Sequence, residues 1–132
     1  MRAKNATREV GDYTAEMYLP PYDPRLDKGL WHGGSESTPK EVVHHCEIRY
    51  RGKVVPLMRG AYSDLAEVNA ISFYKNQRGE MVLKIEGGDA ADSYRAYLVF
   101  SKGRLVRRHV ESSGFPNNFS EETRYVAIPV LD

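Results

Sequence analysis

The chain has 132 residues, of which 41% are hydrophobic and 28% charged, as expected of one globular domain with its own core. Nineteen Lys and Arg residues nearly balance eighteen Asp and Glu residues, so the net charge of +1 argues against a nucleic-acid partner. The single cysteine excludes an internal disulfide, and no apolar run in the sequence is long enough to span a membrane.

The chain begins with a polar stretch, and we expect residues 1–12 to be a flexible N-terminal segment ahead of a single β-rich domain at residues 13–132. Apolar and polar side chains alternate over residues 13–19, which predicts the first strand. Three prolines end this strand, and the chain then shows no regular period up to residue 40. This irregular segment contains the only tryptophan, Trp31.

Alternation returns over residues 41–50 and predicts a second strand, with His44 and Cys46 on the same face. Two ligands on one face fall short of the four that a structural zinc site needs, so we predict no metal site and no cofactor. Cys46 is then expected to be a small core residue. A tight turn follows, and Pro56 indicates that the return strand lies at a sheet edge or is broken there.

Residues 68–110 are typical of two consecutive β-hairpins. The first turn, Asn76–Gly79, ends in the glycine that a type I turn followed by a left-handed residue requires. This turn pairs Asn76 with Glu80 and thereby predicts the register of the hairpin. On one face that register pairs apolar residues across the strands, namely Phe73 with Leu83 and Ile71 with Ile85.

The second turn, Phe100–Gly103, is interpreted in the same way, so that Phe100 pairs with Arg104. On the face away from the core this register places Tyr97 opposite Arg107 and Arg95 opposite His109. Like charges that face each other destabilise a sheet, so we expect a carboxylate nearby, either from this chain or from a partner. The candidates within the chain are Glu121 and Glu122.

Later turn signals predict a short helical turn at residues 118–122 and a last strand at residues 125–131. About seven or eight short strands at this spacing predict an all-β fold with little helix, either a small antiparallel β-sandwich or an open barrel with meander connections. The expected core residues are Ile71, Phe73, Met81, Leu83, Ile85, Leu98, Val99 and Val106.

No serine lies in a Gly-x-Ser-x-Gly motif, and we assign no catalytic residue. Aromatic residues on irregular segments, together with arginines on the predicted ribbon, are typical of recognition surfaces. We therefore expect a non-enzymatic binding protein whose partner is another protein, with anion contacts from Arg95, Arg107 or Arg108. The predicted partner-binding residues are Trp31, Arg95, Tyr97, Arg107 and His109.

In size and strand layout the chain is similar to small bacterial β-rich proteins of the cell envelope, including inhibitor and immunity proteins that block a partner enzyme. Two alternatives stay open at this point. One is a carrier that holds a lipid or other small ligand in a barrel mouth, and the other is a small enzyme with a site built on His44 and His109. The expected compartment is the periplasm or cell envelope if a leader has been removed, and otherwise the cytoplasm.

Overall fold

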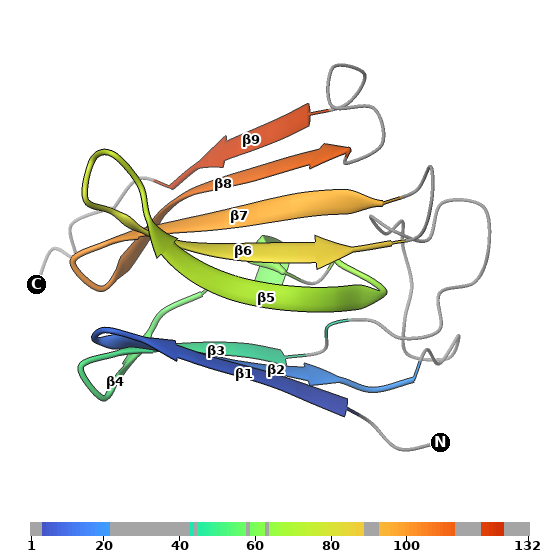
Figure 1. Cartoon of the computed structure of the whole chain (residues 1–132), viewed down its shortest axis with the longest axis horizontal. Helices are drawn as coiled ribbons and strands as arrows, with labels where there is room; N and C mark the ends of the chain where they lie inside the picture. Colours follow the sequence, from blue (N-terminus) through green and yellow to red (C-terminus); the bar gives the residue numbers. More distant parts are fainter. Residues whose placement is uncertain are drawn as a thin grey trace, which may run out of the picture.

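A computed structural model shows two antiparallel sheets that pack face to face as a β-sandwich (Figure 1). The residues that the structure describes are 4–21, 43, 45–57, 59–62, 64–88, 93–112 and 120–125. Within them the only helical element is a short 3₁₀ turn, η1 (Arg59–Ala61), in the connection between the sheets. The predicted all-β antiparallel fold is confirmed, in its sandwich form.

The first sheet has the strand order β1 (Lys4–Val10), β2 (Tyr13–Leu19), β3 (His45–Tyr50) and β4 (Lys53–Val55). Each strand pairs with its neighbour in the sequence, so the sheet is a simple meander. The short strand β4 forms one edge, directly before Pro56, and this confirms the edge position predicted from that proline.

The second sheet is also a meander, so its spatial order follows the sequence. A sequence in which neighbouring strands are joined by short turns folds in this way because consecutive antiparallel strands meet without crossing connections. Its strands are β5 (Val68–Lys75), β6 (Met81–Gly87), β7 (Tyr94–Ser101), β8 (Arg104–Ser112) and β9 (Ser120–Arg124).

Strand β1 corrects the expectation that no strand precedes Tyr13. It pairs with β2 along its whole length, from Lys4 opposite Leu19 to Val10 opposite Tyr13. An edge strand needs backbone hydrogen bonds from one neighbour only, so its sequence can remain polar. Alternation of apolar and polar side chains identifies half-buried strands, so it did not predict β1.

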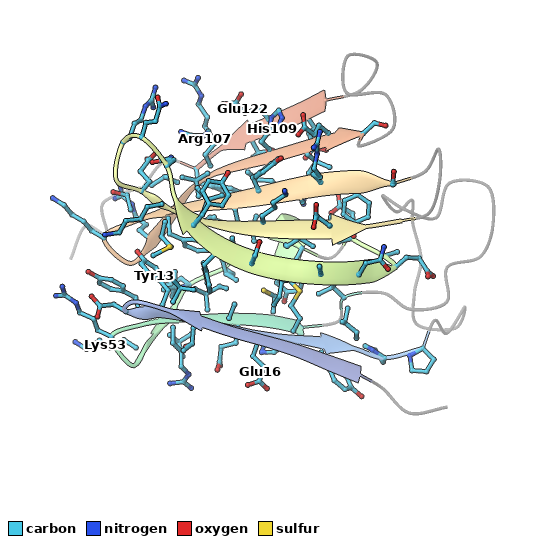
Figure 2. The ribbon with its side chains drawn as sticks, in the orientation of Figure 1. Tyr13, Glu16, Lys53, Arg107, His109 and Glu122 are labelled. Carbon is cyan, nitrogen blue, oxygen red and sulfur yellow. The ribbon has the colours of Figure 1, made fainter. Side chains whose placement is uncertain are left out.

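The core fills the space between the two sheets with alternate residues of the facing strands. Five of the predicted core residues are buried in it: Ile71, Met81, Leu83, Ile85 and Leu98. Phe73 is partly buried and packs against this core. Tyr13 contributes from the first sheet and lies between the layers, 5.8 Å from the ring of Phe100 (Figure 2).

Two predicted core residues are placed differently by the structure. Val99 is buried but lies on the outer face of the second sheet, apart from the core. Val106 is only partly buried, because the pairing of β7 with β8 passes from Leu105 to Arg107 across a bulge. Leu105 and Val110 take the corresponding places in the core.

The predicted register of the first hairpin is confirmed. Phe73 pairs with Leu83 and Ile71 with Ile85, and the backbone N–H of Asn76 donates to the carbonyl of Glu80 at 3.0 Å. The side chain of Asn76 also accepts a hydrogen bond from the N–H of Glu80 at 2.9 Å, which fixes the turn. Gly79 has the expected left-handed backbone, with φ of +79°.

The predicted register of the second hairpin is wrong. Lys102 and Gly103 both have positive φ values, 51° and 77°, so the turn has two central residues and pairs Ser101 with Arg104. The bulge beside Leu105 adds a further shift. As a result, Tyr97 faces His109 rather than Arg107, and Arg95 faces Glu111 rather than His109.

The last described strand also differs from the prediction. Residues 120–124 form β9 and pair with β8, so the helical turn predicted at residues 118–122 is wrong where the structure describes it. Most of the strand predicted at residues 125–131 lies outside the described residues. In the part of the chain that the structure describes, no helix is long and apolar enough to cross a membrane.

Candidate functional site

The outer face of the second sheet carries a shallow hollow of about 380 Å³, which we call the outer-face depression. Its polar rim comes from strands β5, β7, β8 and β9, and its floor contains two valines. Figure 2 shows Arg107, His109 and Glu122 on the side of this sheet that points away from the first sheet. The lining residues are Tyr74, Asn76, Val82, Tyr97, Val99, Arg107, His109, Glu111 and Glu122.

The structure brings four of the five predicted binding residues to this face. Tyr97, Arg107 and His109 line the depression, and Arg95 is tied to it through an ion pair with Glu111. They share a face although the predicted register was wrong, because a shift of two residues keeps every side chain on its side of the sheet. Trp31 lies outside the described residues.

Glu111 organises the centre of the site, and the sequence interpretation missed it. Its Oε1 accepts a hydrogen bond from the hydroxyl of Tyr97 at 3.0 Å and lies 3.2 Å from Nε of Arg95. Its other oxygen lies 3.8 Å from Nε2 of His109. The expected carboxylate therefore comes from β8 itself, and the correct hairpin register would have identified it, since Glu111 directly faces Arg95.

Tyr97 is held in a fixed orientation by these contacts. Its ring lies 5.9 Å from the His109 ring, and its hydroxyl is bound to Glu111. Burial raises the pKa of Tyr97, and the hydrogen bond to Glu111 and the charge of that carboxylate raise it further, to about 12. The phenol is therefore a neutral hydrogen-bond donor across the physiological range.

This pKa makes a testable prediction for alkaline pH. The ordinary pKa of tyrosine is about 10, so above this pH the unfolded chain loses a proton that folded Tyr97 keeps up to pH about 12. The stabilising contribution is complete below pH 10 and is lost as the pH rises toward 12. We expect Tyr97→Phe to lose less free energy of unfolding than the parent between pH 9 and pH 11 in urea titrations. Parallel pH profiles for the two proteins would contradict this assignment.

Arg107 lines the depression, and its ion pair is longer than that of Arg95. Its Nη2 lies 3.5 Å from Oε1 of Glu80, and that same oxygen accepts a shorter hydrogen bond, 2.9 Å, from the side-chain amide of Asn76. A guanidinium has five N–H donors in a planar fork. Arg107 can therefore hold its contact with Glu80 and still donate to an acceptor in the depression.

No protein-family model, no curated protein and no solved structure matches the chain. The side chains of the site and their contacts are thus the basis for the function proposed below.

Arg108 corrects the expectation that it contributes an anion contact to a partner. It lies on the core side of β8, and its side chain is only 2% exposed. It donates to the carbonyl of Gly60 at 2.6 Å and to Oδ2 of Asp64 at 2.7 Å, and its Nε lies 3.0 Å from Oε1 of Glu121. Burial lowers its pKa, but the bond to Asp64 and the nearby carboxylate charges outweigh this and raise it. Arg108 thus joins β8, β9 and the connection between the sheets.

Cys46 and the possible metal ligands were the other candidates for chemistry in the sequence. Cys46 is confirmed as a buried core residue, and burial raises the pKa of its thiol to about 12, which makes it unreactive near neutral pH. Among the described residues, no group of three His, Cys, Asp or Glu side chains could hold a metal ion. His44 lies outside those residues, so the enzyme built on His44 and His109 stays a hypothesis.

Proposed function

We propose that the protein is a non-enzymatic binding protein that contacts a protein partner through the outer-face depression. The observation that supports this most is the arrangement around Glu111, which holds Tyr97 and Arg95 in place before any partner arrives. A side chain that is already ordered loses little conformational entropy on binding. The outer-face depression is therefore preorganised for binding.

The residue types in the depression fit a partner that presents a carboxylate next to an apolar side chain. Val82 and Val99 provide an apolar floor, and Tyr74 and Tyr97 provide ring area at low entropic cost. Arg107 supplies the N–H donors for a carboxylate at the rim. Arg95 has a different role in this proposal, because its pairing with Glu111 makes it a positioning residue.

The most concrete form of this proposal is an inhibitor or immunity-type protein of bacterial origin that occludes a partner enzyme. Two observations support it. The fold is a small meander sandwich, and Tyr97 is held by Glu111 on the outer face of its second sheet. A rigid sheet presents such a face with little change of shape on binding. Under this proposal the partner enzyme loses activity when the complex forms.

The test begins with capture of the partner from the source cell and continues with calorimetric titration of the purified pair. We expect Arg107→Ala to weaken binding by about 30-fold, the effect of losing a charge-assisted contact worth about 2 kcal/mol. Tyr74→Ala is expected to weaken binding as well. Tyr18→Ala is the matched control, because Tyr18 is 44% exposed on the first sheet and Tyr74 is 42% exposed on the second.

Equal losses for Tyr18→Ala and Tyr74→Ala would contradict the proposal, as would unchanged affinity for Arg107→Ala. Urea unfolding of each variant separates lost binding from lost stability, since Arg107 also contacts Glu80. An enzyme assay on the captured partner then tests the inhibitor form. A partner whose activity is unaffected at saturation would overturn that form and leave the binding surface itself supported.

A further inference from the structure

One end of the sandwich gathers the hairpin turns of both sheets (Figure 1). Between them lies a cleft of about 460 Å³, which we call the turn-end cleft. This volume is within the range of clefts that hold small organic molecules. The lining residues are Gly11, Asp12, Tyr13, Tyr50, Arg51, Lys75, Arg78, Gly79, Glu80, Met81, Phe100, Ser101 and Lys102.

The two carboxylates of the cleft are already engaged. Oδ2 of Asp12 lies 3.2 Å from Nε of Arg51. Oε1 of Glu80 binds the side-chain amide of Asn76 at 2.9 Å and lies 3.5 Å from Arg107, which belongs to the outer-face depression. The negative charge of the cleft is therefore largely neutralised by cations of the chain itself.

Three further cations line the same cleft without such a partner. Lys75, Arg78 and Lys102 are exposed, and none forms an ion pair with a carboxylate among the described residues. They come from the end of β5 and from the turns that join β5 to β6 and β7 to β8. Like charges that gather around one hollow repel one another, and a bound anion relieves that repulsion.

Aromatic side chains also line the cleft: Tyr50 is partly exposed there and packs against the buried Tyr13. The rings of Tyr13 and Tyr50 are 4.7 Å apart, and the hydroxyl of Tyr13 accepts a hydrogen bond from the N–H of Gly103 at 3.0 Å. The guanidinium of Arg51 lies 5.0 Å from the centre of the Tyr50 ring. The site thus combines an apolar surface for a flat group with a cationic rim for a charged one.

We propose that the turn-end cleft binds a small organic anion that carries a phosphate or carboxylate group next to a ring. The anionic group contacts Lys75, Arg78 and Lys102, and the ring lies against the exposed part of Tyr50. The lining of this cleft includes none of the side chains assigned to partner contact, so the proposal does not depend on the proposed binding function.

Calorimetric titration with four simple probes tests the proposal: phenyl phosphate, benzoate, inorganic phosphate and phenol. We expect phenyl phosphate or benzoate to bind, and the preferred one identifies the anionic group. We expect inorganic phosphate and phenol to bind at least about ten-fold more weakly, because each lacks half of the recognised chemistry. Failure of both ring-bearing anions to bind at millimolar concentration would overturn the proposal.

Two variants locate the binding. Arg78→Gln removes one cation, and Lys102→Asn removes another while keeping a residue that tolerates the left-handed turn, where φ is 51°. Each is expected to weaken binding of the preferred probe by about ten-fold, the effect of losing one charge-assisted contact. The matched control is Lys84→Gln, which removes the same charge from the outer face of β6 and should change affinity less than two-fold. An equal loss for all three variants would indicate non-specific attraction and overturn the proposal.

Discussion

Replacement of Arg108 by Met is expected to lower the free energy of unfolding by about 3 kcal/mol, measured by urea unfolding at neutral pH. The substitution removes the guanidinium that pairs with the carboxylates of Asp64 and Glu121 and that donates to the carbonyl of Gly60. The two carboxylate side chains are 34% and 39% exposed, so water can solvate them in part. This places the effect at the low end of the range for breaking a buried ion pair.

Two further proteins separate the causes of that loss. Arg108→Lys keeps the charge but not the planar fork that reaches three partners, and should lose an intermediate amount. A triple variant that also carries Asp64→Asn and Glu121→Gln removes the two negative charges that Arg108 pairs with and should regain much of the stability. If Arg108→Met alone proved as stable as the parent, the cluster around Arg108 would not hold β8, β9 and the connection between the sheets together.

The second large effect is expected at Gly103, where Ala should cost about 2–4 kcal/mol. Gly103 has φ of +77°, and a Cβ there would lie 2.6 Å from Cδ2 of the Tyr50 ring. A left-handed backbone costs a non-glycine residue about 1 kcal/mol or more, and overpacking adds about 1–3 kcal/mol. Tyr50 cannot move away easily, because its ring is packed against Tyr13.

Gly79 provides a matched control for this prediction. Its φ of +79° is nearly the same, but a Cβ at this position would meet nothing within 4 Å. Gly79→Ala should therefore show the backbone cost alone, about 1 kcal/mol, in the same urea titration. Equal losses for the two variants would show that Tyr50 does not press on the second turn as the structure indicates.

The two hairpins show what the sequence could and could not predict. The first register was predictable because Asn76 and Gly79 are the residues that this type of turn requires, and the apolar pattern agreed with it. The second was not, because Lys102 takes a left-handed conformation that a lysine rarely adopts, and a bulge adds a residue beside Leu105. The left-handed lysine leaves the alternation of side chains unchanged, whereas the bulge moves Val106 out of the core and puts Leu105 in its place.

The candidate site was also predictable only in part. The outer face of β7 and β8 was predictable because period-two alternation survives a shift of two residues, so Tyr97 and His109 stay together. The expectation that Arg108 contacts a partner was wrong because its burial depends on Asp64 and Glu121. Asp64 lies far from it in the sequence, and Glu121 lies on β9, a strand that was not predicted. A charged residue is buried only with such partners, and sequence spacing does not show them.

The proposed binding face can be tested most directly by photo-crosslinking in the complex with the captured partner. A benzophenone amino acid is placed at position 74 in one protein and at position 18 in another, because both tyrosines there are similarly exposed on opposite sheets. We expect position 74 to crosslink to the partner and position 18 not to do so. Crosslinking from position 18 but not from position 74 would place the partner on the first sheet and contradict the assignment of the outer-face depression.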